Sequence, residues 1–267
     1  HPQAKPNIVH RRLAQMEQAG RLTALVTQNI RTINSAFREE CRREVEALHA
    51  RGIAAMVPLN CTIWETAWYM RSMEEMMVGM MTDDPLTERH FERITVLAEQ
   101  RAAAFASCGA DLLHLGDDIG MQQTIMMSHE LYRKHLKPRL ARVVQAAKAA
   151  KPDMVITYHS CGYVTPFITD LMEAGVEVLN PVQPECMDFA EIHAEYGKKL
   201  SFWGTVGTQS TMPFGTPDEV KAVVRRNLEI AGEAGGLLCT PTHLLEPEVP
   251  WENIEAYVEA CREFRLA

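Results

Sequence analysis

Short apolar runs alternate with longer amphipathic segments along most of this chain. From about residue 50 onward, the apolar runs have the length of buried strands, and the segments between them repeat their apolar positions with a helical period. Strands that alternate with helices form parallel βαβ units with right-handed crossovers. The predicted strands are Ile53 to Val57, Asp111 to Leu115, Met154 to Tyr158, Val176 to Leu179, Leu200 to Trp203 and Gly236 to Cys239.

Chemical signals mark where several helices begin. The sequence Thr216-Pro217-Asp218-Glu219 combines a capping threonine, a proline at the first helical position and a glutamate at the third. Ser128 and Asp84-Pro85 have similar features. We therefore predict amphipathic helices over Ser128 to Lys148 and Pro217 to Glu233.

The order of elements predicts an α/β fold. No Gly-x-Gly-x-x-Gly motif follows an early strand, which disfavours a doubly wound dinucleotide-binding sheet. We predict one (β/α)8 TIM-type barrel domain over residues 1–267, complete or shortened at its N-terminus. Residues 1–50 are expected to be mainly helical, although Leu22 to Val26 reads equally well as a strand. In such a barrel, the chemistry gathers at the C-terminal ends of the strands.

Composition narrows the class of protein. The 267 residues are 46% hydrophobic, which is enough for a large single core, and they carry a formal net charge of -8. Lys and Arg are scattered, so we expect no nucleic-acid partner. There is no run of 18 apolar residues and no signal-peptide core, so we expect no membrane partner and a cytoplasmic location. An odd number of cysteines, seven, argues against a disulfide framework.

A histidine and a cysteine two residues apart follow the predicted strand Met154 to Tyr158. Side chains alternate along a strand, so His159 and Cys161 project to the same face. Imidazole and thiolate are zinc ligands, and a catalytic zinc site adds a third ligand and leaves one position open. For the third ligand the sequence offers His243, which we prefer, and Cys239. The competing interpretation is a buried thiol beside a hydrogen-bonded core histidine.

Two further segments follow predicted strands. Asp117 and Asp118 are adjacent and point to opposite faces, so we expect only one of them to enter the barrel mouth. That carboxylate would act as general acid or base, bind a cationic group of the substrate or orient a ligand histidine. A solvent-exposed turn explains either residue equally well.

Trp203 and Gln209 border a stretch of small residues that leaves room for a ligand, and core packing of Trp203 is the alternative.

Six short motifs occur in a characteristic order: Gly116 to Gln122, Tyr158 to Gly162, Asn180 to Gln183, Phe202 to Gly204, Pro241 to His243, and Val249 to Ile254. In this order they resemble the uroporphyrinogen decarboxylase superfamily. More narrowly, they are similar to the His-x-Cys-Gly branch, which is related to zinc methyltransferases that act with corrinoid proteins and with thiols such as coenzyme M. The resemblance covers about residues 50–265 and implies a (β/α)8 barrel with its site at the C-terminal mouth.

The resemblance also implies a set of metal ligands. In the thiol methyltransferases of the superfamily, zinc is held by the His and Cys of the His-x-Cys motif and by a distant Cys. The first two carry over onto His159 and Cys161. Counted back from the segment Pro250 to Ile254, the distant position falls on His243 rather than on Cys239. The implied site is therefore His/Cys/His.

These observations predict a zinc-dependent enzyme, a methyltransferase that moves a methyl group between a small-molecule thiol or methyl ether and a corrinoid (cobalamin). A separate protein would supply the corrinoid. Asp117 or Asp118 would manage protons or orient the substrate, and Gln183, Trp203 and Gln209 would line the pocket.

Two alternatives belong to other classes. A metal-independent decarboxylase of the same superfamily requires a cluster of arginines at the barrel mouth, for which Arg71 and Arg139 are the candidates. A non-catalytic binding protein would use all four donors, His159, Cys161, Cys239 and His243, in a closed structural metal site.

Overall fold

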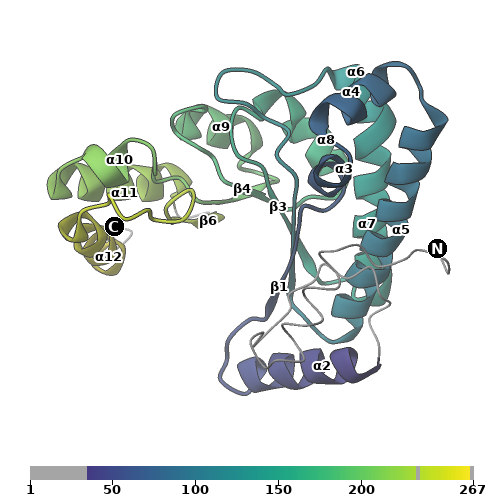
Figure 1. Ribbon diagram of the computed structural model, residues 1–267. Coiled ribbons are helices and arrows are strands. Elements are labelled where there is room, and N and C mark those ends of the chain that lie inside the picture. The colour runs from purple at the N-terminus through teal and green to yellow at the C-terminus, as the bar shows by residue number, and fades with distance from the viewer. Residues whose placement is uncertain (1–34, 233–234, 265–267) are drawn as a thin grey trace, which may run out of the picture. The chain divides into compact units, whose positions relative to one another are not determined.

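The computed structural model describes residues 35–232 and 235–264, all within one compact unit. A parallel sheet of six strands lies at its centre (Figure 1). Every strand begins within three residues of the start of the predicted run. The strands are β1 (Met56–Asn60), β2 (Leu112–Gly116), β3 (Val155–His159), β4 (Val178–Asn180), β5 (Ser201–Trp203) and β6 (Leu237–Leu238).

The strands lie side by side in the order in which they occur along the chain. A doubly wound sheet reverses this order at a switch point, whereas a (β/α)8 barrel does not. The predicted α/β class and the barrel-type strand order are therefore confirmed. Within the described ranges the sheet is open, because β1 pairs only with β2 and β6 only with β5.

Helices connect successive strands. Among the residues that the structure describes, no helix is long and apolar enough to cross a membrane. The helices, including one π-helical and one 3₁₀ segment, are α2 (Ser35–His49), α3 (Trp64–Met70), α4 (Met73–Met81), α5 (Pro85–Ser107), α6 (His129–Leu131), η1 (Tyr132–Leu136), α7 (Lys137–Ala150), η2 (Thr165–Phe167), α8 (Ile168–Glu173), α9 (Phe189–Tyr196), α10 (Thr211–Phe214), α11 (Pro217–Ala231) and α12 (Trp251–Glu263).

The predicted helix starts are present. Asp84 caps α5 by accepting hydrogen bonds from the backbone N–H groups of Leu86 and Thr87. At the start of α11, Thr216 Oγ1 accepts from the Glu219 N–H at 3.3 Å, and the Glu219 carboxylate accepts from the Thr216 N–H at 2.7 Å. This reciprocal pair is the capping box expected from the sequence. Helices α5 and α7 run along each other beside the sheet (Figure 1).

One predicted helix is divided. Ser128 caps the start as expected, but the chain passes from α6 through the π-helical turn η1 into α7. Pro138, in the first turn of α7, has no N–H group, so the i→i−4 hydrogen-bond pattern is interrupted there. Of the N-terminal segment, α2 is helical as expected. Residues 1–34, with Leu22 to Val26, lie outside the described residues.

Two groups of buried side chains fill the fold. The larger group extends from α2 to β5 and contains the fully buried rings of Trp64, Phe91 and Phe167. The smaller group joins β6, α11 and α12 and consists of Val206, Met212, Val220, Val224, Cys239, Val249, Ala256 and Ala260. Burial of these apolar surfaces fixes the helices on the sheet, so the strand ends are held in place.

Candidate metal centre and cavity

Strands β2, β3 and β4 end side by side and bring their following residues to one edge of the sheet. Their register pairs Gly116 with His159, and His159 with Asn180. Position 116 must be small, because a Cβ atom there would lie 2.8 Å from the His159 Cβ and 2.9 Å from the His159 carbonyl oxygen. The register therefore places the residues after β2 directly beside the end of β3.

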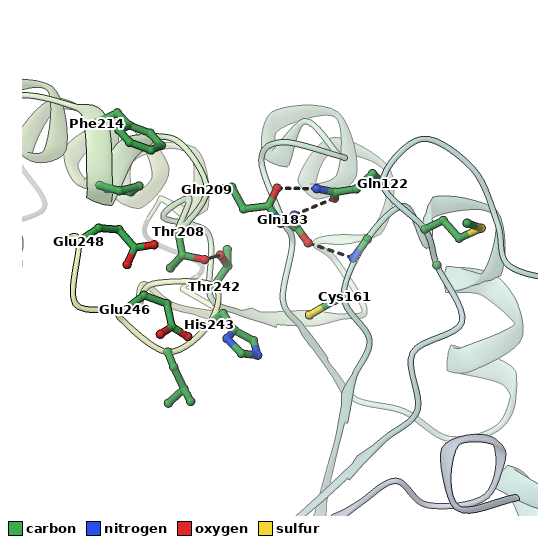
Figure 2. A pocket seen from close by; sticks show the side chains of 15 residues that line it. Gln122, Cys161, Gln183, Thr208, Gln209, Phe214, Thr242, His243, Glu246 and Glu248 are labelled. Atoms are coloured by element: carbon green, nitrogen blue, oxygen red, sulfur yellow. Dashed lines mark hydrogen bonds between the residues drawn. The ribbon is translucent and has the colours of Figure 1, made fainter. Parts of the chain in front are cut away.

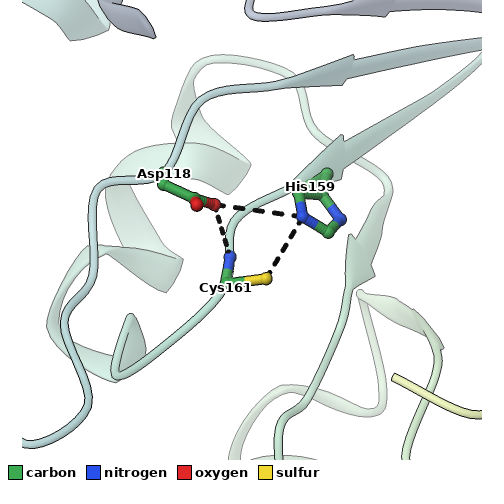
Figure 3. A group of neighbouring side chains, drawn as sticks. All are labelled: Asp118, His159 and Cys161. Atoms are coloured by element: carbon green, nitrogen blue, oxygen red, sulfur yellow. Dashed lines mark hydrogen bonds and ion pairs between the residues drawn. The ribbon is translucent and has the colours of Figure 1, made fainter. Parts of the chain in front are cut away.

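Asp118, His159 and Cys161 form a group at this edge (Figure 3). The Cys161 Sγ lies 3.4 Å from the His159 Nε2, and the Asp118 Oδ1 lies 3.9 Å from the same nitrogen. Zinc bonds of about 2.1 Å to nitrogen and 2.3 Å to sulfur, at a tetrahedral angle, separate these two donors by about 3.6 Å. The observed separation of nitrogen and sulfur is close to that value, so the pair can hold a metal ion with little movement.

A hydrogen-bond chain from Asn180 fixes the proton on His159. The Asn180 Nδ2 donates to the Trp203 carbonyl oxygen at 2.8 Å, so the Oδ1 of the same amide faces the His159 Nδ1, 2.7 Å away. The Nδ1–H then donates to Asn180, and the lone pair on Nε2 points toward Cys161. This is the tautomer that a metal ligand requires.

The Cys161 thiol lies in an environment that disfavours its free anion. Burial, followed by the negative charges of Asp118 and Glu65, raises the pKa of Cys161 to about 12. A divalent cation beside the sulfur reverses this preference, because it stabilises the thiolate. An imidazole lone pair, a thiol and a carboxylate are all donors that zinc accepts, so these residues fit a zinc ion.

The two adjacent aspartates point in different directions. Asp118 faces His159 and accepts a hydrogen bond from the Cys161 N–H at 2.8 Å. Asp117 is buried and accepts from the N–H groups of Ile63 and Glu65 at 2.9 to 3.1 Å, which holds the start of α3. Burial raises the pKa of Asp117 to about 7. Of the two aspartates, only Asp118 lies beside His159 and Cys161.

The two candidates for a distant ligand lie in different places. The rings of His243 and His159 have centroids 6.3 Å apart, and His243 lines the cavity described below. Cys239 is buried in the smaller hydrophobic group, with its Sγ 3.8 Å from the Thr205 Oγ1. Among the described residues, neither belongs to the candidate metal group of Asp118, His159 and Cys161, whose donor atoms all lie within 4.8 Å of one another. The four-donor arrangement is therefore not assembled in this structure.

A cavity of about 670 Å³ opens beside Cys161 (Figure 2). A row of side-chain amides forms part of its wall: Gln183 accepts from the Gly162 N–H at 3.0 Å and donates to Gln122, which in turn donates to Gln209. The predicted residues Gln183 and Gln209 thus line the cavity. Trp203 does not, because its ring packs against His114 with centroids 5.0 Å apart. The lining consists of Gly120, Met121, Gln122, Cys161, Gly162, Gln183, Thr208, Gln209, Pro213, Phe214, Thr242, His243, Leu244, Glu246 and Glu248.

Sequence reasoning did not single out several residues of this site. The sequence contains a signal for Asn180, because this residue directly follows the predicted strand Val176 to Leu179 and precedes a proline. Gln122 lies in a recognised motif, but nothing in the sequence indicates that its amide joins those of Gln183 and Gln209. Glu246 and Glu248 follow β6 in an irregular segment whose position depends on the tertiary structure.

Comparisons with known proteins identify the family of this chain. A family model described as uroporphyrinogen decarboxylase (URO-D) matches residues 15–264. A methylcobamide:CoM methyltransferase of Methanosarcina barkeri is 27% identical over 193 residues, covering 72% of this chain and 53% of the relative. A uroporphyrinogen decarboxylase of Pelodictyon phaeoclathratiforme is 26% identical over 160 residues, covering 58% of this chain and 42% of the relative.

The fold has a counterpart among solved structures. A methyltransferase from Methanosarcina mazei superimposes with a TM-score of 0.67 at 21% identity, covering 87% of this chain and 67% of that one. The chain spans about half the length of the curated methyltransferases that it matches. The family model covers nearly the whole chain. This chain therefore belongs to the uroporphyrinogen decarboxylase family.

Proposed function

We propose that this protein is a zinc-dependent methyltransferase that moves a methyl group between a small-molecule heteroatom, of a thiol or a methyl ether, and a corrinoid. The observation that carries the proposal is the pair of donors at the end of β3. The His159 Nε2, with its lone pair directed by Asn180, lies 3.4 Å from the Cys161 Sγ at the edge of a cavity. Relatives named as methyltransferases support the reaction class.

The residues of the site have distinct roles in this proposal. His159 and Cys161 hold the metal, with Asp118 or His243 as the third ligand. A zinc ion held there would supply Lewis acidity, which lowers the pKa of a thiol or makes an ether oxygen a better leaving group. In transfer to a thiol, the thiolate sulfur would form a bond to the methyl carbon while the bond between that carbon and cobalt breaks, and the electron pair of the broken bond would stay with the corrinoid. The amides of Gln183 and Gln209 orient the small molecule.

The corrinoid is proposed to come from a partner protein. A cavity of about 670 Å³ lies within the range of sites for small molecules, so it suits the thiol or ether rather than the larger corrinoid. One relative is named for its action on a methylcobamide, which supports a corrinoid as the second substrate. The corrinoid would then approach the cavity from outside, with its cobalt toward the bound heteroatom.

A metal-independent decarboxylase is the second candidate, favoured by the similarity to uroporphyrinogen decarboxylases. It requires cationic side chains for a polycarboxylate substrate. Arg71 instead bonds to Glu75 and Thr87, and Arg139 bonds to Glu88 and packs over the ring of Phe91. Neither arginine lines the cavity, so the methyltransferase fits the site better.

Elemental analysis of the purified protein and its variants tests the proposal. We expect one zinc ion per chain, loss of that zinc in Cys161→Ser, and full occupancy in Cys261→Ser, which changes an exposed thiol of α12. The zinc-loaded protein should also speed transfer from methylcobalamin to a thiol, followed by absorbance. A folded protein that binds no zinc, or that binds it equally well in Cys161→Ser, would favour the decarboxylase.

A further inference from the structure

The cavity has two chemically different walls (Figure 2). One wall carries the Cys161 sulfur and the amides of Gln122 and Gln183. The opposite wall carries His243, Glu246 and Glu248, and the sulfur points across the cavity toward it. A small molecule whose heteroatom lies at the sulfur therefore directs its far end toward a wall with two carboxylates.

Carboxylates are the only permanently charged side chains of the cavity lining. Among its fifteen residues there is no lysine and no arginine, and Glu246 and Glu248, on the wall that also carries His243, are its two carboxylates. Elsewhere on the surface, carboxylates pair with cations, as Glu92 and Glu99 do with Arg142. Within the described ranges, neither Glu246 nor Glu248 has such a partner. Their negative charge is therefore available to a ligand.

Zinc bound by Asp118 and Cys161 would have its charge balanced by these two anionic donors, so Glu246 and Glu248 set the sign of the field at the far wall. A ligand with a sulfonate or carboxylate at its far end would face these two glutamates with no lysine or arginine in the lining, whereas an ammonium group would be attracted. Phe214 and Leu244, both largely exposed in the same lining, offer apolar contact to the carbon atoms of such a ligand.

We infer that the small molecule bound here is a thiol with a cationic far end, an aminothiol, held by the metal at its sulfur and by Glu246 and Glu248 at its ammonium group. This inference rests on the proposed function and names its substrate class. It differs from what the similarity to a methylcobamide:CoM methyltransferase suggests, because coenzyme M is 2-mercaptoethanesulfonate, an anion.

Three thiols with the same two-carbon chain test the inference. They are 2-aminoethanethiol, 2-mercaptoethanol and 2-mercaptoethanesulfonate, whose far ends are cationic, neutral and anionic. Their binding to the zinc-loaded protein is measured by isothermal titration calorimetry. We expect the aminothiol to bind about 5- to 10-fold more tightly than the neutral thiol, since each partly exposed charge contact contributes a modest factor. The sulfonate should bind most weakly, and added salt should reduce the differences.

The three thiols differ in intrinsic acidity. This difference cancels when their affinity ratios are compared between variants of the protein. In the double variant Glu246→Gln with Glu248→Gln, the affinity ratio of aminothiol to sulfonate should fall by about tenfold, while 2-mercaptoethanol binds as before. The control Glu252→Gln, which removes a carboxylate of α12 outside the cavity lining, should leave the ratio unchanged.

The outcomes separate the two proposals. Equal or tighter binding of the sulfonate, or a ratio that the double variant does not change, would overturn the inference and leave the zinc methyltransferase in place. Failure of all three thiols to bind the zinc-loaded protein would overturn both.

Discussion

Asn180 determines which nitrogen of His159 faces Cys161 as an acceptor. Its amide cannot turn over without breaking the bond that its Nδ2 makes to the Trp203 carbonyl oxygen, so the Oδ1 remains a fixed acceptor for the Nδ1–H. A free imidazole distributes its proton between both nitrogens, so without this bond part of the molecules would carry the proton on Nε2, the nitrogen that faces Cys161. The hydrogen bond to Asn180 would thus prepare His159 for the proposed metal ion.

Replacement of Asn180 should affect zinc binding through this hydrogen bond. We expect Asn180→Leu to weaken zinc affinity about 10- to 100-fold, as is usual for loss of such a partner, because the His159 Nδ1 loses its acceptor. Asn180→Asp keeps an acceptor oxygen and should recover most of the affinity. Competition with a chelator measures affinity, and ¹⁵N NMR of the imidazole reports the tautomer. Equal zinc affinity in the two variants would contradict this role for Asn180.

At the scale of elements, the loop after β3 is held by close backbone contact with the loop after β2. The Tyr163 N–H donates to the Met121 carbonyl oxygen at 2.7 Å. Gly162 has φ +83°, and a Cβ atom there would lie 2.6 Å from that same oxygen. The position of Cys161 therefore depends on a glycine that both adopts a left-handed conformation and leaves room for the neighbouring loop.

A pair of glycine variants separates backbone strain from steric contact. Gly52 also has a positive φ, +69°, but nothing lies within 4 Å of the Cβ that an alanine would add. We expect Gly52→Ala to cost about 1 kcal/mol in the free energy of unfolding, from strain alone. Gly162→Ala should cost about 1 to 3 kcal/mol more and should also weaken zinc binding, because the loop must move.

Urea denaturation and zinc titration measure the two effects in each variant. Similar losses of stability for Gly52→Ala and Gly162→Ala, with zinc affinity unchanged in the second, would show that the contact between the loops does not position Cys161.

At the scale of the whole molecule, a buried histidine couples stability to pH. His114 on β2 is buried, hydrogen-bonded to Thr157 and next to Trp203. Burial, with a smaller contribution from His159, lowers the pKa of His114 from 6.5 to about 4. Between these values the unfolded chain binds the proton more readily than the folded one. The contribution of His114 to the free energy of unfolding is therefore largest above pH 6.5 and falls as the pH drops toward 4.

The size of this fall is about 3 kcal/mol for a shift of this magnitude. In His114→Asn, the side-chain amide can still bond to Thr157 but does not titrate. The free energy of unfolding of this variant should depend less on pH. The difference in this free energy between the variant and the protein that retains His114 should therefore shrink or reverse between pH 6.5 and 4. Chemical denaturation at several pH values measures both curves. Parallel curves over this range would show that His114 does not control the pH dependence.

Much of the fold could be predicted because it depends on local patterns. Buried parallel strands need continuous apolar runs, and helix starts need side chains that satisfy free N–H groups, so Thr216 and Glu219 identify a helix start without tertiary information. The division of the helix after Ser128 was missed because amphipathic periodicity continues through a π-helical turn. The sequence did not predict that the sheet is open within the described residues. Strand pairing at the edge of a sheet depends on which segments lie next to each other in the folded chain.

The sequence by itself determined the parallel α/β order and the proximity of His159 to Cys161, because alternation along one strand is a local property. It also indicated the family through the order of its motifs. Only the tertiary structure decided which of two adjacent aspartates faces His159 and Cys161, that Asn180 sets the tautomer of His159, and that Cys239 lies in a hydrophobic cluster while His243 lines the cavity. These outcomes depend on side chains from strands far apart in the chain. Their distances are fixed by packing and register, which no local pattern records.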